Sequence, residues 1–227
     1  MDRIDAIMLG TAPLDYGKVK MQLDSMQGKR ELSGQTAGHK GATLEYRKIE
    51  GLEFDPLFLD YMQAPVFRHI CVRAYGERTA ISSFRAMFMN KPARGGTRLT
   101  WHQDRWTHMS PDPLITVWTA LDPATVANGC VEIIAGSHLK LINPEHNSGF
   151  LTEKHIEEIV RPARQEYLEL KAGESALLHN WTLHSSAVNG TDAARRAFSV
   201  CYMPATTVSS RGNTFNQVFG PEALTLA

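Results

Sequence analysis

The sequence lacks the features that mark several broad classes of protein. Its three cysteines, Cys71, Cys130 and Cys201, are too few and too scattered for a disulfide framework. No apolar run approaches the roughly 20 residues that cross a bilayer, so no membrane partner is expected. The 24 basic and 24 acidic residues cancel, so no nucleic-acid partner is expected either.

Two further observations concern the compartment. Residues 1–6 include charged side chains and are followed by no long apolar run, which disfavours a signal peptide. Each cysteine stands among apolar residues, a setting that is typical of buried free thiols. Together these observations favour the cytoplasm.

The pattern of apolar residues predicts a mainly β protein with helices near its start. Helical spacing predicts helices over 12–27, over 55–75 with a break at Pro65, and over 152–160. Apolar and β-branched runs predict strands over 81–89, 114–121, 129–134, 167–171, 174–179, 183–188 and 195–203. Many short strands behind early helices indicate an α+β fold, with a cupin-like jelly roll (double-stranded β-helix) and a helical N-terminal layer.

The length of 227 residues and the spread of motifs along it favour one domain over 1–227. Its parts are a helical part over about 1–78, a jelly-roll core over about 79–205 and a C-terminal tail over about 206–227. Residues 28–43, rich in Gly, Ser, Thr and Lys, are predicted to form a mobile loop and are a candidate lid.

His102 and Asp104 form the first part of a candidate metal site. On a strand, residues i and i+2 point to one face roughly 6.6 Å apart, so both can bind one ion while Gln103 points away. His184, far downstream, completes the two histidines and one carboxylate that hold non-haem Fe(II) and leave positions open. Taken alone, His-x-Asp is equally typical of a hydrogen-bonded surface pair.

The chain after His184 adds a cationic group. Asn189-Gly190-Thr191-Asp192 are strong turn formers, and a four-residue hairpin loop there would set Ser186 opposite Arg195. Cross-strand parity then places Arg195, and not Arg196, on the face of His184, whereas a slip of one residue would exchange the two arginines. Arg195 can bind a carboxylate through two hydrogen bonds, with Ser186 as a further donor. The alternative is an ordinary charged pair at a strand start.

With these residues in view, roughly residues 50–205 resemble the phytanoyl-CoA dioxygenase family of Fe(II)/2-oxoglutarate oxygenases. The matching blocks, in order, are Met89-Asn90-Lys91-Pro92, Trp101-His102-Gln103-Asp104, Val117–Asp122, Asn128-Gly129-Cys130-Val131, Gly136-Ser137-His138 and His184-Ser185-Ser186 with Asn189 and Arg195. Ala135 departs from the proline that the family usually has there, a change that concerns local rigidity. Halogenating relatives lack the metal carboxylate, so the presence of Asp104 argues against halogenation.

The resemblance implies a role for each matching residue. The implied iron ligands are His102, Asp104 and His184, and the implied contacts of the cosubstrate 2-oxoglutarate are Arg195, Ser186, Trp118 and Met87. Trp106 and Arg105 directly follow the metal motif and are candidate substrate residues, although Trp106 fits a plain core position equally well. His179 lies at an odd spacing from His184 and is predicted to be structural.

The sequence therefore predicts a dioxygenase that uses Fe(II), 2-oxoglutarate and O2 to hydroxylate an unactivated C–H bond of a small-molecule metabolite, releasing succinate and CO2. A desaturase, epimerase or ring-forming oxygenase would use the same residues. A zinc metallohydrolase with the same triad is an alternative from another class, and Arg195 and Ser186 argue against it. A catalytically silent jelly-roll binding protein is a third, disfavoured by the intact triad. The substrate and the oligomeric state, monomer or homodimer, stay open.

Overall fold

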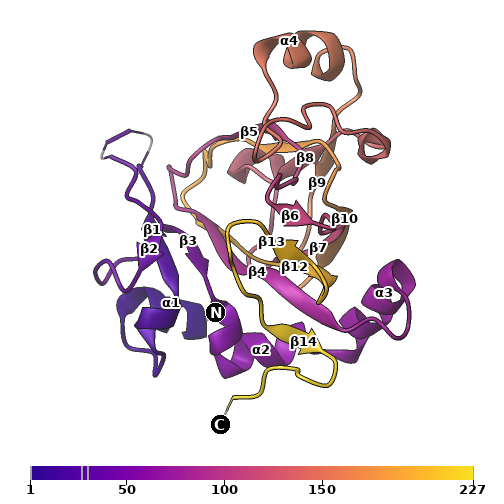
Figure 1. The fold of residues 1–227 in the computed structure, drawn as a ribbon. Coiled ribbons are helices and arrows are strands. Elements are labelled where there is room, and N and C mark those ends of the chain that lie inside the picture. Colours follow the sequence, from indigo (N-terminus) through magenta and orange to yellow (C-terminus); the bar gives the residue numbers. More distant parts are fainter. Residues whose placement is uncertain (1, 27, 30, 227) are drawn as a thin grey trace.

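The computed structural model describes residues 2–26, 28–29 and 31–226, and within them two antiparallel sheets form the body of the protein (Figure 1). The larger sheet has the strand order β10-β7-β12-β4-β3-β1-β2, and β14 also pairs with β4. Its strands are β1 (Lys20–Leu23), β2 (Thr36–Ala37), β3 (Tyr46–Glu50), β4 (Ile81–Lys91), β7 (Ile115–Ala120), β10 (Ser175–His179), β12 (Arg195–Pro204) and β14 (Gln217–Phe219).

The smaller sheet has the order β5-β11-β8-β9. Its strands are β5 (Leu99–His102), β8 (Val131–Ile133), β9 (Glu166–Leu168) and β11 (His184–Ser186), and a separate short pair joins β6 (Met109–Ser110) to β13 (Val208–Ser209). Two sheets with crossovers between them form a jelly roll, as the sequence predicts.

The helices begin and end where local chemistry dictates. They are α1 (Asp2–Leu9), α2 (Pro56–Met62), α3 (Pro65–Tyr75) and α4 (Glu153–His155), the last continued by a π-helix over Ile156–Val160, with 3-10 turns at Tyr16–Lys18, Leu52–Phe54, Val126–Asn128 and Ser137–Leu139. The side chain of Asp55 accepts from the backbone N–H of Leu57 and caps α2, and prolines open both α2 and α3. Across the described residues, no helix is both long and apolar enough to span a bilayer.

Helices α1, α2 and α3 cover the outer face of the larger sheet (Figure 1). Phe88 on β4 and Phe198 and Tyr202 on β12 are buried in this layer, and the Tyr202 hydroxyl donates to the carbonyl of Met62 at 2.9 Å. Each large apolar side chain buried in this way stabilises the fold by about 1.5–3 kcal/mol. The residues that alternate with them on β4 point to the inner face, which the smaller sheet covers.

The helix break at Pro65 and the main predicted strands are confirmed, but the helix predicted over 12–27 is wrong. Gln27 lies outside the described residues, and the rest of the segment contains a 3-10 turn and strand β1. Val19 and Met21 are fully buried and alternate with polar residues, which is the strand period of two. Pairing of β1 with β3 decides the conformation.

The predicted helical part over 1–78 also contains β1, β2 and β3, which extend the larger sheet, and the tail over 206–227 supplies β14 to the same sheet. Within the candidate lid over 28–43, Arg30 lies outside the described residues, and β2 pairs with β1. The lid itself stays a prediction.

The hairpin predicted around Asn189 is wrong. Strand β11 pairs with β5 and β8 in the smaller sheet, whereas β12 pairs with β4 and β7 in the larger one. The segment between them crosses from one sheet to the other. Asn189 is fully buried there, and its side-chain amide donates to the carbonyls of Lys91 at 3.0 Å and Pro92 at 3.2 Å. The turn-forming residues therefore hold a crossover in place of a hairpin.

Candidate metal centre and its cavity

A cavity of about 230 Å³ lies between the two sheets. The inner face of β4, β7 and β12 lines one side, and β5, β8 and β11 line the other. The sequence-predicted residues His102, Asp104 and His184 all reach this cavity.

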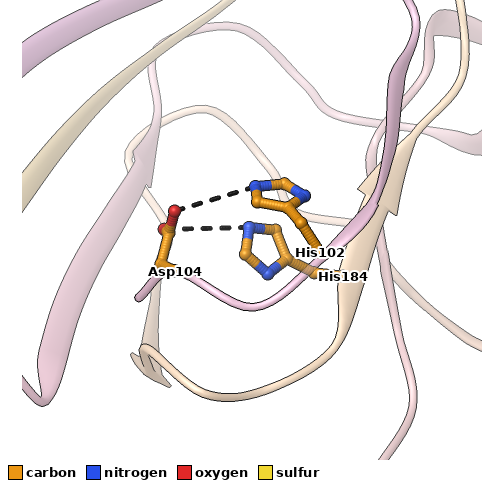
Figure 2. A group of neighbouring side chains, drawn as sticks. All are labelled: His102, Asp104 and His184. Carbon is orange, nitrogen blue, oxygen red and sulfur yellow. Dashed lines mark ion pairs between the residues drawn. The ribbon is translucent and has the colours of Figure 1, made fainter. Parts of the chain in front are cut away.

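These three residues converge on one point (Figure 2). His102 ends β5 and His184 begins β11, and the two are directly paired across the strands, with ring centroids 4.1 Å apart. The Nε2 atom of His102 lies 3.7 Å from Asp104 Oδ1, and that of His184 lies 3.8 Å from Asp104 Oδ2. One donor atom from each residue lies within 4.8 Å of the other two.

Backbone carbonyls orient both imidazoles. His102 Nδ1 donates to the carbonyl of Thr100 at 2.9 Å, and His184 Nδ1 donates to that of Thr182 at 2.8 Å. Since a carbonyl oxygen only accepts, each ring carries its proton on Nδ1 and directs an Nε2 lone pair at the shared point. The Phe150 ring stacks on His102 with centroids 4.7 Å apart.

Asp104 lies beyond the end of β5, so strand parity alone does not place it. Its backbone N–H donates to the carbonyl of Asn180 at 2.7 Å. Gln103 points away, as predicted, and its fully buried amide group donates to the Lys140 carbonyl at 2.8 Å. Gly149 packs against this bend with φ +66°, and a Cβ there would lie 1.9 Å from the Gln103 carbonyl oxygen, so only glycine fits.

The protonation states suit a divalent metal. Burial, together with the neighbouring His184, lowers the pKa of His102 to about 3, so its imidazole is neutral near pH 7. Burial alone would raise the pKa of Asp104, but His184, His102 and cationic neighbours outweigh it and hold that pKa below its usual value. The neutral imidazole of His102, the imidazole of His184 and the carboxylate of Asp104 are a donor set that fits Fe(II).

Arg195 is a buried cation without an acidic partner among the described residues. It is 4% exposed, its Nη2 donates to the Gly129 carbonyl at 3.0 Å, and its Cζ lies 5.5 Å from the centre of the Trp118 ring. Its Nε has no hydrogen-bond partner within the described chain. Burial lowers the pKa of Arg195 to about 10, which leaves it charged at neutral pH. A buried, charged and incompletely bonded guanidinium indicates an anionic ligand.

Arg196, unlike Arg195, is paired with acidic side chains. Its Nε and Nη2 donate to the two carboxylate oxygens of Asp122 at 2.7 and 3.0 Å, and its Nη1 donates to Asp5 at 2.7 Å. Arg195, and not Arg196, lines the cavity with His184, as the parity argument predicted, but the hairpin on which that argument relied is absent. Arg195 faces His184 because the two sheets face each other across the cavity.

The other predicted site residues divide into two groups. Ser186, Trp118, Met87 and Trp106 line the cavity, as does His179, which lies outside the group of three metal-ligand candidates. Arg105 is not among the residues that line the cavity, and its role as a substrate residue stays a prediction. Its side chain leaves the cavity because Nε lies 3.4 Å from Asp112 and Nη1 donates to the Pro144 carbonyl.

Sequence reasoning missed further cations in the cavity wall, namely Arg47, Lys48, Arg85 and Lys91. Burial, followed by repulsion from arginines, lowers the pKa of Lys91 to about 7 and that of Lys48 to about 8. Arg85 already lies within the predicted strand over 81–89 and shares parity with Met87, and extending that strand by two residues would have added Lys91. Lys48 lies on β3, which no sequence pattern indicated.

Comparison with known proteins agrees with this geometry. The model of the phytanoyl-CoA dioxygenase family matches residues 23–197, which include all three metal-ligand candidates and Arg195. The chain belongs to this family. A probable phytanoyl-CoA dioxygenase of Caenorhabditis elegans is 24% identical over 190 residues, which are 79% of this chain and 61% of the relative. The chain spans about half to three fifths of the length of the first curated relatives it matches.

Solved structures share the fold. The non-haem α-ketoglutarate-dependent carbocyclase SnoK of nogalamycin biosynthesis matches with a TM-score of 0.62 at 18% identity, covering 77% of this chain and 74% of that one. The epimerase SnoN, in complex with Fe3+, α-ketoglutarate and nogalamycin RO, matches with a TM-score of 0.60 at 20% identity, covering 72% and 66%. These likenesses support the jelly-roll architecture.

Proposed function

We propose that this family member is a non-haem Fe(II)- and 2-oxoglutarate-dependent dioxygenase that hydroxylates an unactivated C–H bond of a small-molecule metabolite. One observation carries the proposal: a metal-ligand triad and an unpaired buried guanidinium line the same cavity. When bound, Fe(II) would activate O2, which is the oxidant. Two of the four electrons that O2 accepts would come from the conversion of 2-oxoglutarate to succinate and CO2, and two from the C–H bond of the substrate. The complex of SnoN with iron and α-ketoglutarate agrees with this assignment.

Each residue has a definite task in this proposal. His102 and His184 offer Nε2 lone pairs while the carbonyls of Thr100 and Thr182 hold their rings in place, and Asp104 offers the anionic ligand. Arg195 donates to the remote carboxylate of 2-oxoglutarate. A guanidinium suits this task because its planar fork matches a carboxylate.

Three cavity residues complete the cosubstrate site. Ser186 offers a hydroxyl, Trp118 lies against the Arg195 guanidinium, and Met87 supplies an apolar wall. Trp106 lines the cavity as a candidate substrate contact. The apolar side chains of this group exclude water from the reacting groups.

The test is anaerobic titration of the protein with Fe(II) and 2-oxoglutarate, followed by the charge-transfer absorption of the complex. We expect a band in the wild type and none in His184→Ala or Asp104→Ala, with succinate release lowered at least about 100-fold because the metal is lost. His179→Gln is the matched control, since His179 lines the same cavity but is no ligand, and it should keep its metal affinity. Full metal affinity in His184→Ala would rule out the ligand assignment.

Product analysis separates hydroxylation from its relatives. Desaturation, epimerisation and ring formation would use the same residues, and carbocyclase and epimerase activities are described for two structural neighbours. A product that is heavier than the substrate by one oxygen atom is expected for hydroxylation. A zinc metallohydrolase is disfavoured because it has no use for the unpaired Arg195.

We further propose that the protein works in the cytoplasm and that residues 1–227 act as one domain. The three free, buried cysteines support a reducing compartment. Pairing of β1–β3 and β14 with the central strands supports one domain.

A further inference from the structure

Arg85 lies at the end of the cavity away from Arg195. On the pairing of β4 with β12, Arg195 is opposite Lys91, whereas Arg85 is opposite Cys201, six residues further along each strand. At about 3.3 Å per residue, this separation is about 20 Å along the sheet. Both arginines line the cavity, and Asp104 of the triad lies close enough to Arg85 for that charge to lower the pKa of its carboxyl.

Two aromatic rings hold the Arg85 guanidinium. Its Cζ lies 4.9 Å from the centre of the Phe84 ring and 5.0 Å from that of Trp106, and these rings pack edge to face at 4.6 Å. The side chain is 29% exposed and makes no hydrogen bond with the described part of the chain. The guanidinium is therefore oriented in advance, with its N–H donors available to a ligand.

A purely structural role for Arg85 would be its ion pair with Glu50, but this ion pair does not satisfy the N–H donors of the guanidinium. The Glu50 carboxylate lies 3.6 Å from Arg85 Nε, which is an ion-pair distance beyond hydrogen-bonding range. A guanidinium has five N–H donors, so this contact leaves most of them unused. Arg85 could also have a second structural role, in which its positive charge stabilises the Asp104 carboxylate. In that case, replacing Arg85 would change the affinity for the metal.

The charges in the cavity wall also favour an anionic ligand. Its described lining carries five cationic side chains and one carboxylate, that of Asp104. The two negative charges of 2-oxoglutarate balance the two positive charges of Fe(II). Glu50 lies beside Arg85, and Lys91 and Lys48 are partly deprotonated near pH 7 to 8, but the lining as a whole still carries more positive than negative charge. An anionic substrate would supply the missing counter-charge.

We propose that the substrate of this enzyme is a small organic acid and that Arg85 binds its carboxylate. The C–H bond to be oxidised then lies between Arg85 and the triad, within a few bonds of the acidic group. Arg195 and Lys91 serve the cosubstrate at the other end. This inference rests on the proposed function and names the class of substrate for that site.

The experiment is calorimetric titration of the protein loaded with Mn(II) and 2-oxoglutarate. The probes are benzoate and hexanoate, the neutral amides benzamide and hexanamide, and phenyl phosphate. We expect at least one carboxylate to bind 10-fold or more tightly than its amide, and Arg85→Gln to weaken that binding about 10- to 100-fold. Arg85→Lys should keep part of the affinity. Arg161→Gln, at an exposed residue that follows the π-helix, should keep all of it.

Failure of the inference is distinguishable from failure of the proposed function. If the wild type does not bind Mn(II) and 2-oxoglutarate, the proposed function fails. If both bind but acids bind no better than amides, or equally well to Arg85→Gln, the inference is overturned. Loss of Mn(II) affinity in Arg85→Gln would overturn the inference, because it would show that Arg85 supports Asp104. If phenyl phosphate binds more tightly than the carboxylates and this binding depends on Arg85, the acidic group of the substrate is a phosphate and the proposed carboxylate is wrong.

Discussion

Arg195 and Arg85 occupy the two ends of one cavity, and each lies over a tryptophan ring, Trp118 for the first and Trp106 for the second. Their surroundings differ. Arg195 is 4% exposed, is bonded to the Gly129 carbonyl and lies opposite Lys91. The Arg85 side chain is 29% exposed and makes no hydrogen bond within the described residues.

This difference indicates two kinds of ligand. A closed, fully desolvated guanidinium with a second cation beside it suits a ligand that is the same in every turnover, because burial strengthens each contact. A guanidinium that solvent can reach, and that two rings and a long ion pair hold, suits a ligand that must enter and leave freely. In the two proposals, the same pairing of arginine with tryptophan binds the cosubstrate at one end and the substrate at the other.

The sharpest test of the comparison uses the adjacent arginines. Arg195→Gln should weaken 2-oxoglutarate binding to the Mn(II) protein about 100-fold, because a buried charge-assisted contact is lost. Arg196→Gln should leave that affinity unchanged and lower the melting temperature, since Arg196 pairs with Asp122 and Asp5. Titration calorimetry and thermal unfolding measure both. Equal affinities of the two variants for 2-oxoglutarate would show that Arg195 does not bind this cosubstrate.

A second test concerns the destabilising effect of the buried Lys91 charge near Arg195 on the folded protein. The pKa of Lys91 is about 7 in the folded protein, because of burial and then Arg195, against about 10.4 in the unfolded chain. Between these values the unfolded state binds the extra proton, so the ligand-free wild type gains stability as pH rises, by at most about 1.4 kcal/mol per pH unit. Lys91→Met lacks this term.

The free energy of unfolding of Lys91→Met relative to the wild type should therefore be most favourable below pH 7 and decline towards pH 9. Urea unfolding at pH 6, 7, 8 and 9 measures it. A difference in the free energy of unfolding that stays constant over this range would show that the pKa of Lys91 is not lowered in the folded protein.

The smallest effects are expected from the two tryptophans. Trp118→Leu should weaken 2-oxoglutarate binding, and Trp106→Leu should weaken binding of the carboxylate probe, each about 2- to 5-fold, which corresponds to about 0.5–1 kcal/mol for a cation over a ring. Calorimetry of both ligands with both variants gives the four values. If either variant weakens both ligands equally, the two ends are not independent.

Local patterns predicted the parts of the fold that neighbouring residues decide. The break at Pro65 follows from the missing N–H of proline, and the strand at β12 follows from its apolar run. The helix predicted over 12–27 failed because Val19 and Met21 take their conformation from β3, more than 20 residues away. The hairpin around Asn189 failed because the same turn residues also suit a crossover whose partner, Lys91, is distant in sequence.

The sequence by itself determined the chemistry: two histidines, one aspartate and one arginine, of types and spacings that suit a metal and a carboxylate. Only the tertiary structure decided which side chains share a cavity. Arg195 and Arg85 line the same cavity as the triad because two sheets built from distant segments face each other. Strand pairing between distant segments depends on packing and on loop closure, which no local pattern of residues encodes.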